Sequence, residues 1–350
     1  MTSRPLLMVL LSTVACGSGV FLTNASIASD APAAIVQLNG SGATFPAPLY
    51  KKWIAEYQKD HLQVLLNYKP VGSGEGVKQF MAGAVDFGAS DAAMSDEQMA
   101  GVARGVQLVP MTAGIIVVAY NLEGLKDELR LTRDLYVDIF LGKIKQWNDA
   151  RITAVNPGVN LPNDDIVIVV RQDSSGTTYA FTNHLSAIST EWRDRGPGTG
   201  TLVNWPGNVM RAIGNEGVAG RIKLSKGALG YVEYGFAQRA GLAIAQLQNQ
   251  AGQFIRPSGT SGLATLINTP MPDNLRVFVP DPQGTDSYPI VTYSWLLLYK
   301  SYEDQQKIAV LKQYVKWCLT SGQDFSESLG YIRLPPQVIG RATEALNSVK

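Results

Sequence analysis

The side chains best suited to bind an anion are concentrated in residues 171–178, where an arginine, an aspartate, two serines and two threonines lie close together. The segment follows an apolar run that ends at Val170 and precedes a helical pattern over residues 179–185. The first N–H groups of a helix have no partner inside it, and they lie at its positive end. An arginine fork, hydroxyl groups and such N–H groups together form an anion cradle. The alternative is an ordinary helix cap beside a surface pair of Arg171 and Asp173.

Three other segments combine Gly, Ser or Thr with a helix start or a strand end. They are residues 40–45, 72–76 and 86–92. The second lacks both the spacing of a dinucleotide fingerprint and the Lys-Ser/Thr ending of a P-loop, so nucleotide binding is not favoured. Taken singly, each segment is also typical of a turn, and Asp91 in the third is more typical of a helix cap than of a functional group.

The elements that would position these segments belong to an α/β protein. Short apolar runs typical of strands alternate with helical patterns. Residues 45–57 predict a helix with a large apolar residue at every fourth position, and Ser95 with Gln98 predicts a capping box. Another amphipathic face runs over residues 308–318. The predicted strands are residues 115–120, 166–170, 276–279 and 290–299.

Composition limits the class of protein. The chain has 350 residues, with 30 Lys and Arg against 29 Asp and Glu, so its formal net charge is +1. So balanced a charge does not suit a nucleic-acid-binding protein. A hydrophobic fraction of 45% supports a large core, and the length favours about two units of roughly 150 residues. The cysteines are Cys16 and Cys318 and the histidines are His61 and His184, so we expect no disulfide framework, metal site or cofactor.

Residues 1–28 have the order of a secretory signal peptide. Arg4 precedes an apolar run over residues 6–14, and a small-x-small cleavage site lies at residues 26–28. The run is too short to span a bilayer stably. The less favoured alternative is lipid attachment at Cys16, because residues 13–16 loosely resemble a lipoprotein cleavage box. In either form the protein is expected outside the cytoplasm.

An enzyme is a rival interpretation, because Ser175 lies near Asp173 and a histidine, His184, follows. Ser175 lacks the strand–turn–helix elbow of a nucleophilic serine, and His184 would lie about two turns along the next helix. A metal-dependent phosphatase would need several metal ligands that the sequence lacks. We therefore expect no catalytic residues.

In this order, the segments closely resemble the periplasmic phosphate-binding proteins that serve high-affinity phosphate ABC transporters. The resemblance extends from about residue 37 to the C-terminal helices. It includes the string Gly-Ala-Thr-Phe-Pro-Ala-Pro at residues 42–48 and Asp-Phe-Gly-Ala-Ser-Asp at 86–91. Further matching strings lie at residues 72–73, 76–79, 141–144, 175–177, 214–217 and 230–234.

The resemblance implies a type II periplasmic-binding-protein fold. This fold has two α/β lobes, joined by a hinge that the chain crosses twice, with the ligand in the cleft between them. The first lobe would comprise residues 36–112 and 283–350, and the second would comprise residues 113–282. The first three segments would then face the 171–178 segment across the cleft, so closure of the lobes would bring them together.

The resemblance also implies the ligand, its contacts and the partners of the protein. The ligand would be inorganic phosphate, delivered from the periplasm to an inner-membrane ABC permease by a monomeric protein. Asp173 would hold Arg171 in place. The implied phosphate contacts come from Ala43, Thr44, Phe45, Ser73, Asp91, Arg171, Ser175, Gly176 and Thr177.

A carboxylate in an anion site has a physical explanation. Phosphate near neutral pH still carries a proton, which a buried Asp91 can accept in a charge-assisted hydrogen bond. Sulfate has no proton to donate, so Asp91 would face it as an unpaired acceptor and repel it. Most of the remaining ligand contacts would be uncharged dipoles from N–H and hydroxyl groups, which is why a near-neutral chain can still bind an anion.

Two residues depart from the family pattern. Glu75 puts a negative charge near a proposed ligand-binding turn, and we expect it to point outward and stabilise the helix start. Ser174 stands where glycine is frequent. Two alternative functions remain open: a receptor for another tetrahedral oxyanion such as sulfate, arsenate or a phosphate ester, and a surface protein that scavenges or senses phosphate without a transporter.

Overall fold

The computed structural model describes residues 35–125 and 128–350. The predicted signal peptide over residues 1–28, with Arg4 and Cys16, lies outside the described residues. Within the described ranges, no helix is both long enough and apolar enough to cross a membrane.

One mixed sheet runs through the described chain, in the strand order β2-β1-β3-β12-β4-β8-β6-β7, with β13 and β9 also paired to β4. Strand β1 is parallel to β2 and β3, and β6 is parallel to β7 and β8. The strands are β1 (Val36–Gly42), β2 (Val64–Pro70), β3 (Phe87–Ser90), β4 (Val106–Tyr120), β6 (Val167–Arg171), β7 (Met210–Ala212), β8 (Ala228–Glu233), β9 (Ala243–Ile244), β12 (Val291–Tyr299) and β13 (Tyr331–Ile332).

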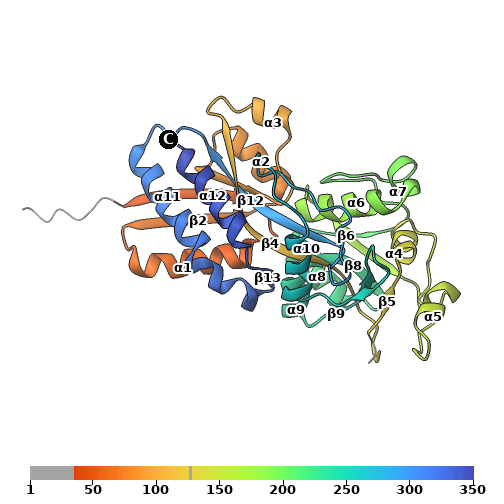
Figure 1. Ribbon diagram of the computed structural model, residues 1–350. Helices are drawn as coiled ribbons and strands as arrows, with labels where there is room; N and C mark the ends of the chain where they lie inside the picture. The colour runs from red at the N-terminus through yellow and green to blue at the C-terminus, as the bar shows by residue number, and fades with distance from the viewer. Residues whose placement is uncertain (1–34, 126–127) are drawn as a thin grey trace, which may run out of the picture. The chain divides into compact units, whose positions relative to one another are not determined.

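Strand β4 is shared by both halves of this sheet. Its residues from Val106 to Ile115 pair antiparallel with β12, and its residues from Ile116 to Tyr120 pair antiparallel with β8. The first half of the sheet is therefore β2-β1-β3-β12 and the second half is β8-β6-β7, with β4 running from one to the other (Figure 1). A two-lobed α/β fold results, as the sequence predicts.

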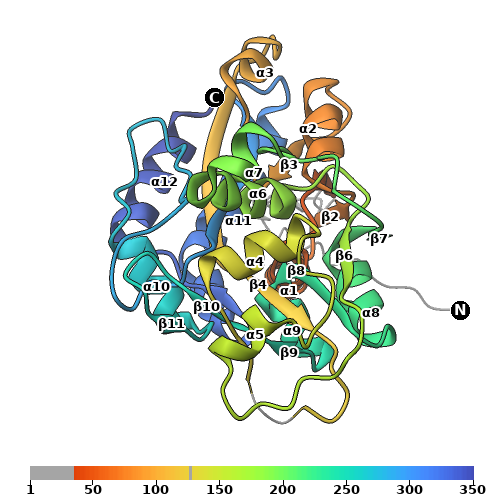
Figure 2. The ribbon, with the colours of Figure 1, turned by 90° about the vertical axis from the view of Figure 1, so that its right-hand side faces the viewer.

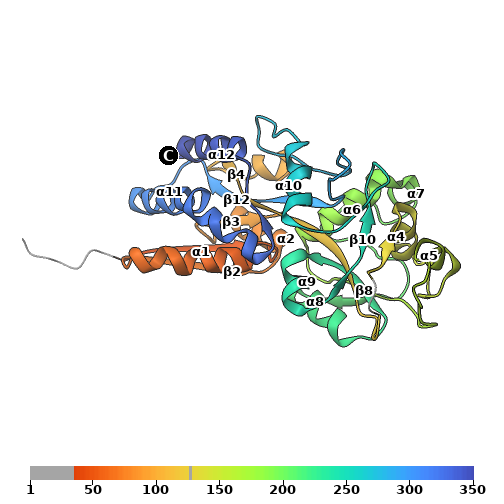
Figure 3. The same cartoon turned by 60° about the horizontal axis from the view of Figure 1, so that its bottom comes forward.

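Helices surround each half (Figures 1 and 3). Near the first half lie α1 (Ala47–Asp60), α2 (Ser73–Met81), α3 (Asp96–Ala100), α11 (Gln305–Leu319), α12 (Pro336–Ser348) and the 3-10 turns Ser321–Phe325 and Glu327–Leu329. The helices between β4 and β12 in the chain are α4 (Arg133–Phe140), α5 (Ala150–Val155), α6 (Gly176–Ile188), α7 (Thr190–Asp194), α8 (Gly214–Leu224), α9 (Tyr234–Ala240) and α10 (Gly259–Ile267). A small separate sheet joins β5 (Arg130–Leu131), β10 (Gln246–Gln248) and β11 (Phe254–Ile255). In Figure 2, α6 and α7 lie above α4 and α5.

The predicted apolar faces are buried. Phe45, Leu49, Trp53 and Tyr57 lie in the core along α1 and the turn before it. The face predicted over residues 308–318 is buried along α11, and Ser95 and Gln98 form the predicted capping box of α3. Burial of these stripes holds α1 and α11 against the sheet.

The prediction of a strand at residues 276–279 is wrong, because this segment has no strand assignment. Its side chains are instead anchored individually. Arg276 donates to Met94 O at 3.1 Å, and the Phe278 ring packs against Tyr179 and Trp295. A short apolar run was the signal for a strand, but a strand also needs a neighbour with which its backbone can pair. The prediction for residues 115–120 falls within β4, and those for residues 166–170 and 290–299 match β6 and β12 to within one residue at each end.

Candidate anion-binding site

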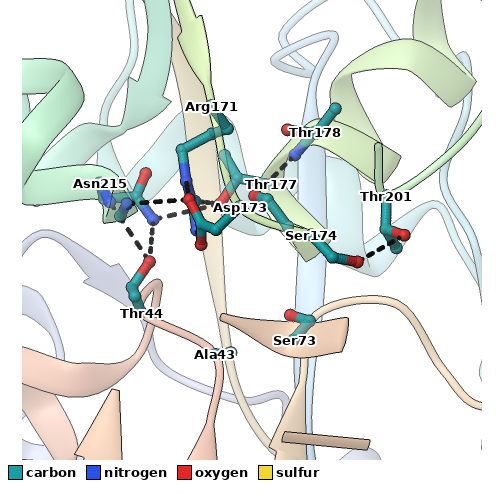
Figure 4. A network of polar contacts seen from close by, with 12 residues as sticks. Ala43, Thr44, Ser73, Arg171, Asp173, Ser174, Thr177, Thr178, Thr201 and Asn215 are labelled. Atoms are coloured by element: carbon teal, nitrogen blue, oxygen red, sulfur yellow. Dashed lines mark hydrogen bonds and ion pairs between the residues drawn. The ribbon is translucent and has the colours of Figure 1, made fainter. Parts of the chain in front are cut away.

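Four connections meet where the two halves of the sheet face each other: the turn after β1, the start of α2, the end of β3 and the turn between β6 and α6 (Figure 4). The approach is close, since a Cβ atom added to Gly176 would lie 2.6 Å from both Asp91 Cβ and Ser73 Oγ. The Gly74 N–H also donates to Ser174 O at 3.1 Å. The segments that the sequence marks as anion-binding are therefore brought together.

Arg171 is the cation of this site. It ends β6, its side chain is 2% exposed, and its Nε donates to Asp173 Oδ1 at 2.8 Å while Nη2 pairs with Asp173 Oδ2. Asp173 also accepts the Gly214 N–H at 3.0 Å. Burial alone would raise the pKa of Asp173, but the hydrogen bonds and charge of Arg171 and the Gly214 N–H hold it below its usual value. Asp173 thus fixes the guanidinium and partly neutralises it.

The N-terminus of α6 supplies donors beside Arg171. Ser175 is the N-cap, and its Oγ accepts the Thr178 N–H at 3.1 Å. Gly176 and Thr177 are the first helical residues, so their N–H groups have no carbonyl one turn earlier to bind. The Thr177 hydroxyl lies 3.5 Å from Arg171 Nη1.

The turn after β1 contributes the opposing surface. Thr44 and Phe45 directly precede α1, and Phe45 is fully buried. The Ala43 N–H donates to Ala89 O at 2.9 Å, and the Ala43 carbonyl accepts the Tyr68 hydroxyl at 2.7 Å. Both main-chain groups of Ala43 therefore have partners, so the available donors of this turn are at Thr44 and Phe45. The predicted contact from Ala43 stays a prediction.

Asp91 follows β3 and is 1% exposed. Its Oδ1 accepts the Ser294 hydroxyl at 2.8 Å, its Oδ2 lies 3.4 Å from Ser73 Oγ, and its N–H donates to Ser73 Oγ at 3.2 Å. Burial raises the pKa of the Asp91 carboxyl to about 7, while the hydrogen bond from Ser294, the charge of Arg171 and the hydrogen bond from Ser73 act to lower it. A carboxyl in this state can exchange a proton near neutral pH.

Two residues of the site were not predicted from the sequence. Ser294 lies in β12 where the register with β4 shifts between Ser294 and Trp295, an irregularity that can redirect a side chain. Asn215, the second residue of α8, connects Thr44 with Thr177 through its amide. The string at residues 214–217 was part of the family resemblance, but nothing in the sequence showed that Asn215 meets the other segments.

The two departures from the family pattern lie beside the site. Glu75 accepts a hydrogen bond from Gln79 at 2.9 Å, lies 3.8 Å from Lys78 and is 43% exposed, so it points outward as expected. Ser174 donates to the Thr201 hydroxyl at 2.9 Å. Both residues line a groove of about 840 Å³ that opens next to Ser73 and Asp173.

Ser175 and His184, the residues of the rival enzyme interpretation, have structural roles. Ser175 caps α6, and His184 is fully buried, with Nε2 2.7 Å from the Tyr136 hydroxyl and Nδ1 2.6 Å from Pro280 O. Burial lowers the pKa of His184 to about 4. Among the residues that the structure describes, no group of three His, Cys, Asp or Glu could hold a metal ion.

A two-lobed α/β fold with a buried arginine and helix-start donors between the lobes is typical of solute-binding proteins. The family model described as "PBP superfamily domain" matches residues 28–321 of this chain. A phosphate-binding protein PstS from Haemophilus influenzae is 39% identical over 307 residues, covering 86% of this chain and 90% of the relative. One from Xylella fastidiosa is 38% identical over 307 residues, covering 87% and 83%. The chain therefore belongs to the family of phosphate-binding proteins PstS, within the PBP superfamily.

Solved structures agree with this fold. A high-affinity periplasmic phosphate-binding protein, PfluDING, solved with phosphate at pH 8.5, has a TM-score of 0.72 and 20% identity, over 87% of this chain and 92% of that one. A phosphate-binding protein from Stenotrophomonas maltophilia has a TM-score of 0.73 and 19% identity, over 88% and 93%.

Proposed function

We propose that this protein captures inorganic phosphate between its two lobes and delivers it to an ABC permease for import. The observation that carries the proposal is that a buried guanidinium, helix-start donors and a buried carboxyl group lie in the same site. Arg171 and the donors at the start of α6 suit an anion, and Asp91 suits an anion that still carries a proton. The PstS relatives are named phosphate-binding proteins, which supports the same ligand.

The proposed phosphate contacts are N–H and hydroxyl groups, one guanidinium and one carboxylate. Asp173 is proposed to hold the guanidinium from behind. The contacts come from Thr44, Phe45, Ser73, Asp91, Arg171, Ser175, Gly176 and Thr177, and from Ala43, whose N–H would have to share its hydrogen between phosphate and Ala89 O. The burial of Thr44, Ser73, Asp91, Arg171, Ser175 and Thr177, none more than 9% exposed, favours a small inorganic ion over a phosphate ester, whose organic part would have to extend out of these buried contacts.

The proposed lobes are residues 36–112 with 283–350, and residues 113–282. The change of β4 partner from β12 to β8 after Ile115 supports a boundary in this strand. The contact between Ile116 N–H and Ile290 O at 2.9 Å supports a second crossing close to the first. Two adjacent crossings would allow the lobes to close by rotation about a hinge.

The rest of the proposal concerns the setting of the protein. We propose export by the signal peptide over residues 1–28, a periplasmic location, a monomeric protein and no catalytic step. The alternative of lipid attachment at Cys16 would tether the same protein to a membrane. Mass spectrometry of the protein from its own cells distinguishes a chain that begins after residue 28 from one acylated at Cys16.

Calorimetric titration of the phosphate-stripped protein tests the ligand. We expect one-to-one binding of phosphate and no heat with sulfate at the same ionic strength. Glycerol phosphate serves as the ester control and should not bind. Equal binding of phosphate and sulfate would contradict the role of Asp91, and absence of phosphate binding would contradict the function.

Uptake measurements separate a transport receptor from a protein that only scavenges phosphate. Deletion of the coding gene should abolish high-affinity uptake of radiolabelled phosphate by the cells, and the gene supplied in trans should restore it. Unchanged uptake with intact binding would favour the scavenging alternative.

A further inference from the structure

Asn215 is buried between the two ligand-binding segments, and both its amide hydrogens and its amide oxygen have hydrogen-bond partners. Its Oδ1 accepts the Glu233 N–H at 3.0 Å, and its Nδ2 donates to Thr44 Oγ1 and Thr177 Oγ1, each at 3.1 Å. Its own backbone N–H donates to Thr44 Oγ1 at 3.2 Å. Figure 4 shows the amide lying between these two threonines.

Glu233 fixes which way the amide points. The backbone N–H of Glu233 can donate only to Oδ1 of Asn215, so the NH₂ group of Asn215 must face the two threonines. Glu233 cannot easily turn away, because it is fully buried and its two carboxylate oxygens accept the N–H groups of Gly235 at 2.9 Å and Phe236 at 3.3 Å. The donor face of Asn215 is thus set by the start of α9.

This arrangement determines what the two threonine hydroxyls can do. A hydroxyl has one hydrogen to donate and two lone pairs to accept with. Thr44 Oγ1 accepts twice from Asn215, and Thr177 Oγ1 accepts from Asn215 and faces Arg171 Nη1 at 3.5 Å. Because the acceptor positions are filled by donors, each hydroxyl must direct its own hydrogen toward another acceptor.

We propose that Asn215 is a positioning residue that makes Thr44 and Thr177 hydrogen-bond donors to the bound anion. The inference rests on the proposed phosphate function, in which both threonines contact the ligand. Asn215 also joins a turn next to the first half of the sheet to the start of α6 in the second half. Its two hydrogen bonds require both segments to be in place, so it couples their approach to anion binding.

Asn215→Asp is the decisive variant, because it keeps the size of the side chain and replaces the donor by an acceptor. One carboxylate oxygen can still accept the Glu233 N–H, but the other would take the hydrogens of the threonine hydroxyls. Phosphate would lose two donors and face a new negative charge. We expect its Kd at pH 8 to rise by at least about 100-fold.

Asn215→Ala removes the donor but leaves both hydroxyls free to turn toward phosphate. We expect a smaller loss of affinity, about 10-fold. A purely structural role predicts the opposite order, because alanine leaves a cavity and an unpaired Glu233 N–H whereas aspartate does not. If Asn215→Ala raises the phosphate Kd at least as much as Asn215→Asp does, the proposal is overturned. If Asn215→Asp does not fold, an unchanged Kd in Asn215→Ala overturns it as well.

A double-mutant cycle separates hydroxyl orientation from plain charge repulsion. In the Thr177→Val background, the loss of phosphate affinity caused by Asn215→Asp should be smaller. This background already lacks one of the two hydroxyls that the new carboxylate would reorient. A penalty of the same size in both backgrounds would mean that repulsion alone acts, and would overturn the proposal.

Asn249 provides the matched control. It is also fully buried, but its amide donates to the carbonyls of Gly284, Thr285 and Ser287 and accepts the Gln253 N–H at 3.0 Å. Asn249→Asp should lower the melting temperature and leave the phosphate Kd unchanged. If wild type binds phosphate and Asn215→Asp binds it with equal affinity, this inference is refuted and the proposed function stands. Wild-type protein that does not bind phosphate would refute the function itself.

Discussion

At the scale of single residues, Asp91 shows how burial and hydrogen bonding prepare a carboxyl for a protonated anion. The carboxyl is removed from water, which favours its neutral form, while Ser294 and Ser73 donate to it and Arg171 lies near enough to stabilise its charge. The opposing effects leave its pKa at about 7, close to the pH at which phosphate itself exchanges a proton.

Replacement of Asp91 tests its role in selectivity. Asp91→Asn should weaken phosphate binding by roughly 10-fold or more, because the amide cannot accept a proton as strongly as a carboxylate. Sulfate binding should rise from undetectable, because the repelling charge is gone. Calorimetry with both anions provides the measurement, and a variant that still binds phosphate like wild type and excludes sulfate would contradict the assignment.

The stability of the phosphate-free protein should depend on pH through Asp91. The pKa of Asp91 is raised in the folded protein. Between about pH 4 and pH 7, the folded state therefore keeps a proton on Asp91 that the unfolded chain has already released. The free energy of unfolding should therefore fall as pH rises through this window, by on the order of 1 kcal/mol per pH unit from this group. Burial also raises the pKa of Glu233, to about 8, so its contribution has the same sign.

Urea unfolding at several pH values isolates the contribution of Asp91. From pH 4 to pH 7, the free energy of unfolding should fall more for wild type than for Asp91→Asn, so the variant should gain stability relative to wild type. Asp286→Asn, at an exposed position, is the control and should show no such trend. A pH-independent difference for Asp91→Asn would show that its carboxyl titrates at an ordinary pKa.

At the scale of elements, the helix start of α6 must come within contact distance of β3 and α2. Gly176 makes this possible, because any side chain there would collide with Asp91 and Ser73. The helix also begins with a serine cap, so its free N–H groups point toward the same place.

Gly176→Ala should therefore impair binding more than folding. We expect the phosphate Kd to rise by more than about 10-fold, because the added Cβ keeps the two halves apart and weakens more than one ligand contact. Gly340→Ala in α12, where a Cβ meets no atom within 4 Å, is the control. It should leave the Kd unchanged and stabilise the protein by about 0.5–1 kcal/mol. Equal phosphate affinity in Gly176→Ala and wild type would contradict the close approach.

Arg171 shows that a ligand-binding element can also contribute to stability. Arg171→Ala and Thr177→Ala should both weaken phosphate binding, because both side chains are proposed ligand contacts. Arg171 is also buried against Asp173, so its removal leaves a largely buried carboxylate without its partner. We expect Arg171→Ala to lower the melting temperature as well as the affinity, and Thr177→Ala to lower mainly the affinity. Thermal unfolding and titration of both variants distinguish these outcomes.

At the scale of the whole molecule, the proposal requires the two lobes to move. Thr44–Asn215 and Gly74–Ser174 are direct hydrogen bonds between segments of the two lobes, so their separation would open the site. Phosphate contacts groups on both sides in the proposed complex and should shift the population toward the closed form.

Spin labels at Lys78 and Leu202 would report this movement. Both residues are exposed, and Lys78 lines the same groove as Thr201 beside Leu202. With the buried Cys318 replaced by alanine in the mature protein, phosphate should shorten the distance between labels at Lys78→Cys and Leu202→Cys. A pair at Lys59 and Lys78, within the first lobe, should not change. An unchanged distance in the first pair, with binding confirmed by calorimetry, would rule out closure.

The sequence alone predicts the parts of this protein that depend on neighbours in the chain. Glycine and hydroxyl residues at helix starts, the stripes of α1 and α11 and the Ser95 capping box follow from spacing, because a helix brings residues three and four positions apart together. The anion-binding character of residues 171–178 follows from the same local rules. The tertiary structure decides which of these segments meet.

What only the tertiary structure decides are the contacts between residues that are distant in sequence. Ser294 reaches Asp91 through a register shift in β12, and Asn215 reaches Thr44 across the two halves of the sheet. The Ala43 N–H has its partner in Ala89, and residues 276–279 have no strand beside them. Whether a hydrogen-bonding group is available depends on which distant group it meets, and chain spacing does not contain that information.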